Sequence, residues 1–406
     1  MKKRPALAGG SPLFENPVRV ARPALPDFEA LAPEMRDVLA SGFLSKGHRL
    51  RAFEEALAEH LGVRHAVAVS SGTTGLMLTY QALGLKGEVV VPSFTFMATI
   101  SALVWVGARP VFADADPRTA NLDPSAAEAA INDHTTAIVA VHNHGNPADV
   151  DELRALARRR GLRLVFDAAH ALGSLYKGEP VGPQGDANVF SLSFTKLLVA
   201  GEGGVVATDD DALAEQIRYG REYGNTGNYD SAFAGLNGRM GELAALLALR
   251  GLPALEAGAL HRNRLAELYR EELADVPGLS FQQVRADDRS SYKDFSVKVE
   301  ADAFGLTRDE LAAALEAENV ETRKYYDPPA HRHTAYRRFA PPDEELPNTM
   351  LLAARSLSLP VWSDMEPAVV SRVCEAVRAA HESAAEIRAA LGAEGEGVAC
   401  ATGRSV

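Results

Sequence analysis

The sequence predicts an α/β protein with a large, mainly parallel mixed sheet covered by helices on both faces, followed by a smaller α+β domain. From about residue 66 onward, short apolar runs alternate with helical patterns, which is the βα series of a parallel-rich sheet. After a long helical stretch that ends near residue 276, the pattern changes to short strands and helices typical of a separate unit. Because such sheets bind ligands at the carboxyl ends of their strands, we expect a functional site at that edge.

Residues 1–47 are rich in proline and are predicted to form an N-terminal arm, with one or two short helices in "DFEALAPEMRDVLASGFLS". The large domain is expected over residues 48–255, and it opens with an amphipathic helix in "GHRLRAFEEALAEHLGV". Its predicted strands are the apolar runs "HAVAVSS", "EVVVPS", "RPVFADAD", "TAIVAVH", "LRLVFDAAHALG" and "ANVFSLS". Helical patterns such as "TTGLMLTYQAL" and "DVDELRALARRRG" connect them.

The smaller domain is expected over residues 256–390 and ends in a helix within "EPAVVSRVCEAVRAAHESAAEIRAAL". The final residues, 391–406, read "LGAEGEGVACATGRSV" and show no periodicity. We therefore predict that this tail is disordered.

Charge and cysteine content argue against several classes of protein. The 406 residues include 42 Lys and Arg against 54 Asp and Glu, and a net charge of −12 argues against a nucleic-acid partner. Two cysteines are too few for a disulfide framework, which favours the reducing cytoplasm. The chain has neither an apolar signal core near its start nor 18 uninterrupted apolar residues, so we expect no secretion and no membrane insertion.

Three motifs follow predicted strands and carry chemical groups. In "VSSGTTGL", Gly72 and Thr73 open a helix whose free N–H groups and dipole favour a phosphate, although a well-capped βα turn explains the same letters. In "LVFDAAHALGS", Asp167 ends a strand and can hold a proton on a heteroaromatic nitrogen, with His170 nearby. An N-cap aspartate with a core histidine is the alternative interpretation of that motif.

The third motif is "NVFSLSFTKLLVAGEGG", which contains Lys196 between a strand and a glycine-rich turn. A lysine amine in a dry site, or beside another cation, loses its proton more easily and can attack an aldehyde. Ser191 lies five residues earlier and could bind the same phosphate as Gly72 and Thr73. A surface lysine whose stem lies along apolar groups is the alternative for an isolated residue of this type.

The ordered set of motifs in this chain resembles the DegT and StrS type of pyridoxal-phosphate (PLP) sugar aminotransferases. The motifs are, in order, "SSGTTGL", "DAAHALGS", "FSLSFTKLLVAGEGG", "GLNGRMGELAAL" and "TRKYYDPPAHRHTAY". The resemblance runs from roughly residue 40 to residue 390. It implies the type I fold of PLP-dependent transferases, similar to that of aspartate aminotransferase. It also implies a homodimer with active sites at the subunit interface and L-glutamate as the amino donor.

The resemblance also implies a role for each matching residue. Lys196 would hold PLP covalently and then move a proton between carbon atoms, with Asp167 on the pyridine nitrogen, His170 near the phenolic oxygen and Phe96 stacked on the ring. The phosphate would be bound by Gly72, Thr73 and Ser191, and by Asn237 from the partner subunit. Residues expected near the sugar nucleotide are Tyr325, Tyr326 and His331, and Asn146 is a further candidate neighbour of substrate or cofactor.

The sequence departs from the family pattern at two places. Ser193 and Phe194 stand where the family often has a histidine or glutamine ahead of the lysine, and Gly238 replaces the tyrosine of "NYRM". These differences concern the substrate pocket. Two histidine pairs, His142 with His144 and His331 with His333, lack further ligands at a usual spacing, so we predict no metal site.

The function that the resemblance implies is transfer of an amino group from L-glutamate to the 4-keto sugar of a nucleoside diphosphate, with dTDP as the expected nucleotide. The product would be a 4-amino sugar for secondary-metabolite or glycan biosynthesis. Amination of a keto-cyclitol for an aminoglycoside uses the same constellation and stays open, and so does a PLP-binding regulator without turnover. A sugar dehydratase of this family would have histidine in place of Lys196.

Overall fold

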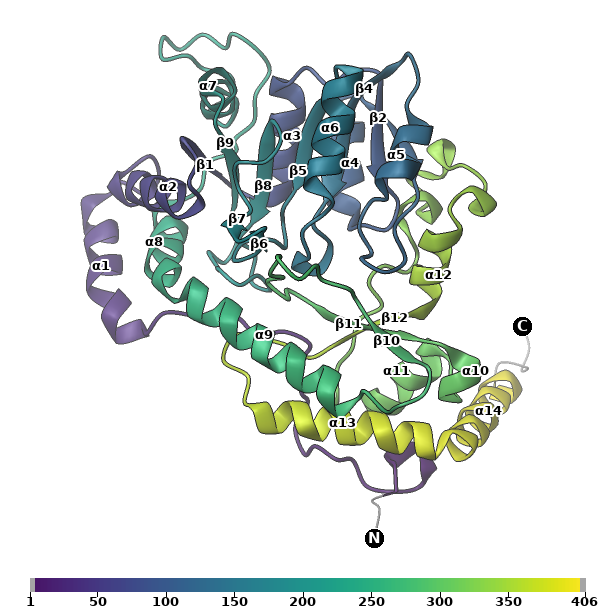
Figure 1. Cartoon of the computed structure of the whole chain (residues 1–406). Helices are drawn as coiled ribbons and strands as arrows, with labels where there is room; N and C mark the ends of the chain where they lie inside the picture. Colours follow the sequence, from purple (N-terminus) through teal and green to yellow (C-terminus); the bar gives the residue numbers. More distant parts are fainter. Residues whose placement is uncertain (1–3, 402–406) are drawn as a thin grey trace.

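The computed structural model describes the backbone of residues 4–401 and the side chains of residues 4–392. It contains a large domain around a seven-stranded sheet and a smaller domain around a three-stranded sheet (Figure 1). The mainly parallel sheet with helices and the smaller α+β unit confirm the predicted fold class.

The large sheet is mixed because one strand runs against its neighbours. β9 pairs antiparallel with both β1 and β8, whereas the β8–β5, β5–β4, β4–β2 and β2–β3 pairs are parallel. In spatial order the strands are β1 (His65–Val69), β9 (Gly204–Thr208), β8 (Ala187–Ser191), β5 (Arg163–Asp167), β4 (Thr135–Val141), β2 (Glu88–Pro92) and β3 (Arg109–Ala113). A two-stranded ribbon, β6 (Leu175–Tyr176) with β7 (Glu179–Pro180), follows β5.

Side chains alternate between the two faces of this sheet, as strand geometry requires. Val165 of β5 packs on one face, and Leu164 and Phe166 pack on the other. Because both faces are buried, every position of the inner strands is apolar or paired, which explains the continuous apolar runs in the sequence. One face is covered by α3 (Gly72–Ala82), α4 (Met97–Trp105) and α7 (Asp211–Gly220), and the other by α2 (His48–Leu61), α5 (Pro124–Ala130), α6 (Val150–Arg160) and α8 (Glu242–Gly251).

The smaller domain packs helices on one antiparallel sheet. Its strands are β10 (Leu279–Phe281), β11 (Phe295–Val299) and β12 (Ser356–Leu359). Its helices are α9 (Leu255–Glu272), α10 (Ala301–Phe304), α11 (Arg308–Ala317), α12 (Pro347–Arg355), α13 (Pro367–Glu382) and α14 (Ala384–Ala401). The connecting 3-10 turns of the chain are η1 (Ala6–Ala8), η2 (Asn143–Gly145), η3 (Leu252–Ala254), η4 (Ala330–Arg332), η5 (Arg337–Phe339) and η6 (Asp343–Glu345).

The long helix α9 joins the two cores. Leu255 and Ala259 pack in the core of the large domain, and from Leu265 onward the buried side chains of α9 belong to the core of the small domain. This change of partner supports the boundary near residue 256 that we propose between residues 48–255 and 256–390.

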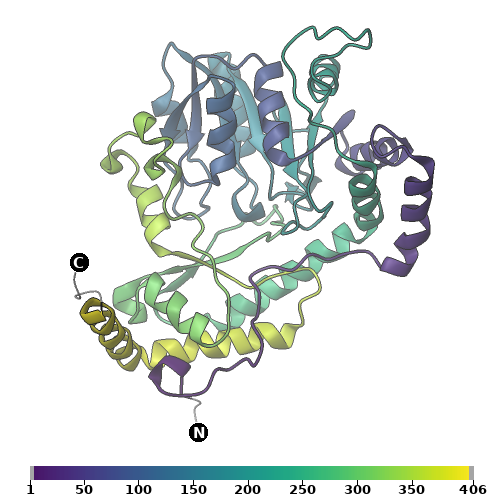
Figure 2. The same ribbon diagram turned by 180° about the vertical axis from the view of Figure 1, so that it is seen from behind.

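The N-terminal arm of residues 1–47 has two parts. α1 (Phe28–Ser41) packs against α8 through Leu31, Val38 and Leu246. The segment before it crosses to the small domain, where Phe14 is buried and Val18 pairs with Val320, and it lies beside α13 and α14 in both views (Figures 1 and 2).

The tail differs from the sequence prediction. The backbone is helical to Ala401 in α14, so the expectation of a disordered tail was wrong for residues 391–401; residues 402–406 lie outside the described part. The physical reason is that this stretch continues a helix anchored on the small domain by the buried Ile387, and extending a formed helix is easier than starting one, even though "GAEGEGVACA" contains three glycines.

The stretch Glu242–Glu272 is long and apolar enough to cross a membrane by length and composition alone, and 33% of its apolar window is buried. It comprises α8, η3 and α9, whose Ala245, Ala248, Leu265 and Tyr269 are buried in the two domain cores. We therefore interpret it as a structural helix pair of this fold.

Candidate active site

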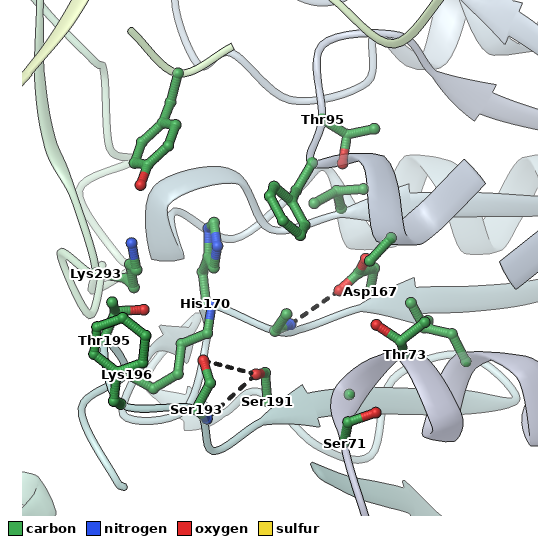
Figure 3. A pocket seen from close by; sticks show the side chains of 18 of the residues that line it. Ser71, Thr73, Thr95, Asp167, His170, Ser191, Ser193, Thr195, Lys196 and Lys293 are labelled. Carbon is green, nitrogen blue, oxygen red and sulfur yellow. Dashed lines mark hydrogen bonds between the residues drawn. The ribbon is translucent and has the colours of Figure 1, made fainter. Parts of the chain in front are cut away.

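A cavity of about 350 Å³ lies at the carboxyl ends of the large-domain strands. The segments that follow β1, β2, β5 and β8 form one wall, and residues of the small domain form the other. Figure 3 shows the labelled side chains of Asp167, His170, Ser191 and Lys196 arranged around this space, with Lys293 on the small-domain side. The lining residues that we predicted for the site are Gly72, Thr73, Phe96, Asp167, His170, Ser191, Lys196, Tyr325 and Tyr326.

One end of the cavity has the features of an anion site. α3 begins at Gly72, and its N-cap Ser71 accepts a hydrogen bond from the Thr74 N–H at 3.1 Å. The N–H groups of Gly72 and Thr73 lie in the first turn, where a helix has unpaired donors and a positive dipole end. A Cβ on residue 72 would lie 3.1 Å from Cβ of Ser191, which is closer than an ordinary contact, so glycine lets α3 approach β8 without a local shift.

Asp167 ends β5 and is buried at the floor of the cavity. Its carboxylate accepts hydrogen bonds from Thr99 Oγ1 at 2.7 Å and from the Ala169 N–H at 3.1 Å. Burial raises the pKa of Asp167, and these two donors oppose that rise. No described side chain forms an ion pair with it, so a buried acceptor faces the cavity with room for one cationic N–H partner.

His170 lies three residues further on, in the turn after β5. Its Nδ1 is buried and has no hydrogen-bond partner in the described structure. Burial lowers the pKa of His170 well below its usual value, and the nearby lysines Lys196 and Lys293 act in the same direction. The imidazole is therefore neutral at pH 7.

Lys196 occupies the turn between β8 and β9. The turn is closed by hydrogen bonds from the Lys196 N–H to the Ser193 carbonyl at 2.9 Å and from the Ala200 N–H to the Leu192 carbonyl at 2.8 Å. Burial lowers the pKa of the Lys196 amine to about 7, and the charge of Lys293 adds to this effect. At neutral pH a large share of the amine is unprotonated, which is the form that attacks a carbonyl carbon.

Phe96 and the two tyrosines line other parts of the cavity. Phe96 is the N-cap of α4, and 47% of its surface is exposed, which leaves its ring accessible for stacking on a planar ligand. Tyr325 and Tyr326 come from the small-domain side, and burial raises the pKa of Tyr325 to about 12, so its hydroxyl stays protonated. Ser193 and Phe194, which depart from the family pattern, also line the cavity.

Two predicted substrate residues do not line the cavity. Asn146 is buried, and its amide donates to the carbonyls of Thr119 and Gln283 at 3.3 and 2.9 Å. His331 is also buried, with Nδ1 paired to Ser93 Oγ at 2.6 Å and Nε2 to Asp343 at 2.9 Å. The polar groups of both residues are used to join segments of the fold, and their contact with the substrate stays a prediction.

Asn237 lies in an exposed loop, where it forms a backbone bridge with Glu222, and it does not line the cavity of its own chain. The family resemblance implies that Asn237 binds the phosphate in the partner subunit's site, and this role stays a prediction. The adjacent Gly238 is required by packing, because a Cβ there would meet Thr74 at 2.9 Å and Arg221 at 3.3 Å.

The histidines of the two pairs named in the sequence make contacts within the fold. His142 accepts a hydrogen bond from the Ala148 N–H at 2.9 Å and stacks on Phe166, and His333 approaches the Pro328 carbonyl. A different group, His144, His170 and Asp294, has its ligand atoms within 4.8 Å of one another. In that group Asp294 already pairs with Lys293 at 2.7 Å, so a cation partner is present without a metal ion.

Sequence reasoning missed Lys293, which lines the cavity from the small domain, and Thr99, which supports Asp167. Both sit inside ordinary secondary-structure patterns, "YKDFSVKVE" and "FMATISALVWVG". Thr99 is a polar residue in an apolar run, whereas Lys293 stands among polar neighbours and has no local signal.

The residues of the cavity fit PLP. The α3 N-terminus with Ser191 suits a phosphate, the buried Asp167 suits a protonated ring nitrogen, and His170 lines the same cavity as Lys196. Lys196 supplies an amine that is reactive at neutral pH. The arrangement can therefore hold a PLP-like group at both of its charged ends and react with its aldehyde.

Comparisons with known proteins agree with this chemistry. The sequence matches the profile of the DegT/DnrJ/EryC1/StrS aminotransferase family over residues 27–378. Spore coat polysaccharide biosynthesis protein SpsC of Bacillus subtilis (strain 168) is 37% identical over 361 residues, which span 85% of this chain and 92% of SpsC. The structure of DesI in the presence of its TDP-sugar product is 41% identical with a TM-score of 0.89, covering 95% of this chain and 98% of DesI. That of S. venezuelae DesV in complex with a ketimine intermediate is 35% identical with a TM-score of 0.80, covering 90% and 99% of the two chains.

Proposed function

The chain belongs to the DegT/DnrJ/EryC1/StrS aminotransferase family, and because the solved structures similar to it are sugar aminotransferases, we propose a reaction of that kind. We propose that the enzyme transfers an amino group from L-glutamate to the 4-keto sugar of dTDP and so makes a 4-amino sugar. The family is PLP-dependent, and PLP is the proposed cofactor. We place the reaction in the cytoplasm.

The observation that carries the proposal is the convergence of Lys196, Asp167 and the anion site in one cavity. The support for a TDP-linked substrate is the similarity to DesI, whose structure was determined with its TDP-sugar product. The carbon that is aminated, the glutamate donor and the nucleotide are parts of the proposal.

When bound, PLP supplies an electron sink that lets a proton leave the carbon bearing the amino group. Lys196 would hold the cofactor and, once its Nζ is free, would accept that proton from glutamate and return one to the sugar carbon. Asp167 would keep a proton on the ring nitrogen, because a buried carboxylate is stabilised by a cationic N–H partner. Phe96 would cover the ring and exclude water, while His170 would lie against the ring near its phenolic oxygen.

A homodimer is proposed because the family site takes Asn237 from a partner subunit. The chain offers a surface for this contact: α1, the segment after it and α8 expose the apolar side chains Phe28, Leu39, Phe43, Leu44 and Leu243. Exposed apolar groups gathered in this way are typical of a protein interface. Light scattering of the purified enzyme measures its mass directly, and a monomer at working concentrations would contradict the proposal.

The reaction is tested by incubating PLP-loaded enzyme with L-glutamate and a dTDP-4-keto sugar, a UDP-4-keto sugar or a keto-cyclitol in parallel. We expect 2-oxoglutarate and a 4-amino sugar in the dTDP reaction and a lower kcat/KM with UDP. Turnover of the cyclitol alone would overturn the sugar assignment. PLP binding without turnover of any acceptor, with no bleaching of the cofactor spectrum by glutamate, would instead support a regulator.

A further inference from the structure

Lys293 is a second lysine in the cavity, and the reaction proposed above does not use it. It lines the cavity from the small domain and is buried, with 4% of its surface exposed. Among the described lining residues the basic side chains other than His170 are Lys196 and Lys293, and no arginine is present. A buried lysine is costly unless its charge has a partner or a use.

The chain holds Lys293 in place through its backbone. The segment Ser290–Asp294 runs from the small domain to the turns that follow β4 and β5, and all five residues are buried. The Lys293 N–H donates to the His144 carbonyl at 3.0 Å, and Ser291 Oγ donates to the His170 carbonyl at 2.6 Å. The segment is thereby fixed to the same turn that carries His170.

A buried arginine on α9 supports this segment from the other side. Arg262 is fully buried, and it donates to the carbonyls of Tyr292 and Lys293 at 3.1 and 3.4 Å. Tyr292 has a φ of +43°, a conformation that is unfavourable for a bulky residue and persists only where surrounding contacts enforce it. These contacts direct the next residue, Lys293, toward the cavity.

The side chain of Lys293 has one carboxylate partner and spare donors. Its Nζ donates to Asp294 at 2.7 Å and lies 5.2 Å from the centre of the Tyr325 ring. Burial alone would raise the pKa of Asp294, but the charge of Lys293 and the hydrogen bond from His144 hold it well below its usual value. Because an ammonium group has three N–H donors, Asp294 uses one and two remain for a ligand.

The donor substrate brings a carboxylate to this part of the cavity. In an α-amino acid the carboxylate is bonded to the same carbon as the amine, so a donor whose amine replaces Lys196 must place its carboxylate in the same cavity. Lys196 cannot be the counterion because its own nitrogen takes part in the exchange. Lys293 is the remaining basic side chain of sufficient reach among the described lining residues.

We propose that Lys293, held by Arg262 and the Ser290–Asp294 segment, binds the α-carboxylate of the amino-acid donor. The inference rests on the proposed function, and it adds a donor-binding site that is separate from the sugar nucleotide. Charge-assisted hydrogen bonds of this kind shorten and strengthen when both groups leave water. Removing the ammonium group should therefore weaken donor binding about 10- to 100-fold.

Glutarate, a dicarboxylate without an amine, tests donor binding without turnover. Its affinity for the PLP-loaded enzyme is measured by titration calorimetry for the wild type, for Lys293→Met and for Lys293→Arg. We expect Lys293→Met to weaken glutarate binding about 10- to 100-fold and Lys293→Arg to recover most of it. Lys298→Met is the matched control, because Lys298 lies on β11 outside the cavity and donates to the Pro117 carbonyl; its glutarate affinity should not change.

Steady-state kinetics separate the two substrates. Lys293→Met should raise the KM for L-glutamate and leave the KM for the keto sugar within about twofold, since the two substrates use different contacts. Unchanged glutarate affinity in Lys293→Met, an equal loss toward both substrates, or a wild-type enzyme that does not bind glutarate would each overturn the inference. If Lys293→Met does not fold, Lys293→Gln gives the same comparison with an amide in place of the charge. Absence of turnover with every keto acceptor would refute the proposed function, while the glutarate series would still decide the role of Lys293.

Discussion

The two walls of the cavity each contribute a lysine, and the two lysines are held in opposite ways. Lys196 of the large domain has no hydrogen bond or ion pair to its Nζ among the described residues, and burial lowers its pKa to about 7. Lys293 of the small domain is paired with Asp294 at 2.7 Å and anchored through its backbone. The large-domain wall therefore presents a reactive amine, whereas the small-domain wall presents a fixed cation suited to binding a carboxylate.

Substitution of Lys196 should have the largest effect and should affect both half-reactions. Lys196→Ala removes the amine that we propose as the proton carrier, so we expect kcat to fall by roughly 10³-fold or more with glutamate and with the keto sugar. Single-turnover absorbance measurements on PLP-loaded enzyme report each half-reaction separately. If the loss fell on one half-reaction only, the division of labour between the two walls would be wrong.

Substitution of Asp167 should have the next largest effect, because we propose that this residue would act on the cofactor rather than on the substrates. Asp167→Asn keeps the size of the side chain but removes the charge that would hold the ring proton, so we expect kcat to fall about 10²-fold for both substrates. Thr99→Val is the control: it removes one donor to Asp167, found at 2.7 Å, and should cost only a few-fold. Equal losses in the two variants would mean that packing, not charge, explains the effect.

The pH dependence of PLP uptake by the apoprotein compares the two lysines directly. In the proposed reaction the neutral form of Lys196 would attack the aldehyde, and burial lowers the pKa of this amine to about 7, so the uptake rate should fall about tenfold per pH unit below 7 and level off above it. The charge of Lys293 lowers this pKa, so Lys293→Met should move the midpoint to higher pH. Stopped-flow absorbance gives the rates, and a midpoint that moved to lower pH would contradict this electrostatic relation.

The two walls also differ in how far the sequence alone could predict them. Gly72, Asp167, Ser191 and Lys196 lie directly after strands, and parallel strands bring their carboxyl ends to one edge, so local motifs were enough to place them together. Lys293 reaches the cavity through contacts with Arg262 and His144, which are far from it in the sequence. His331 and Asn146 are predicted to lie near the substrate because their motifs match the family, and the hydrogen bonds that join them to backbone and side-chain partners have no local signature in the sequence.

The smallest expected effect belongs to the hydroxyl of Tyr325. Tyr325→Phe keeps the ring near Lys293, whose Nζ lies 5.2 Å from it, and removes one hydrogen-bonding group from the small-domain wall. We expect the KM for the keto sugar to rise roughly 2- to 10-fold while the glutamate half-reaction keeps its rate. Steady-state kinetics with each substrate varied in turn would check this, and a larger effect on glutamate would place the donor, not the sugar, against Tyr325.

The central claim is that Lys196, not Lys293, is the lysine that binds the cofactor covalently. Borohydride reduction of the PLP-loaded enzyme fixes the linkage, and mass spectrometry of the digested protein then locates the pyridoxyl group. We expect to find the pyridoxyl group on the peptide that contains Lys196 and not on the peptide that contains Lys293. A label on Lys293, or no labelled lysine after reduction of a PLP-loaded and active enzyme, would contradict it.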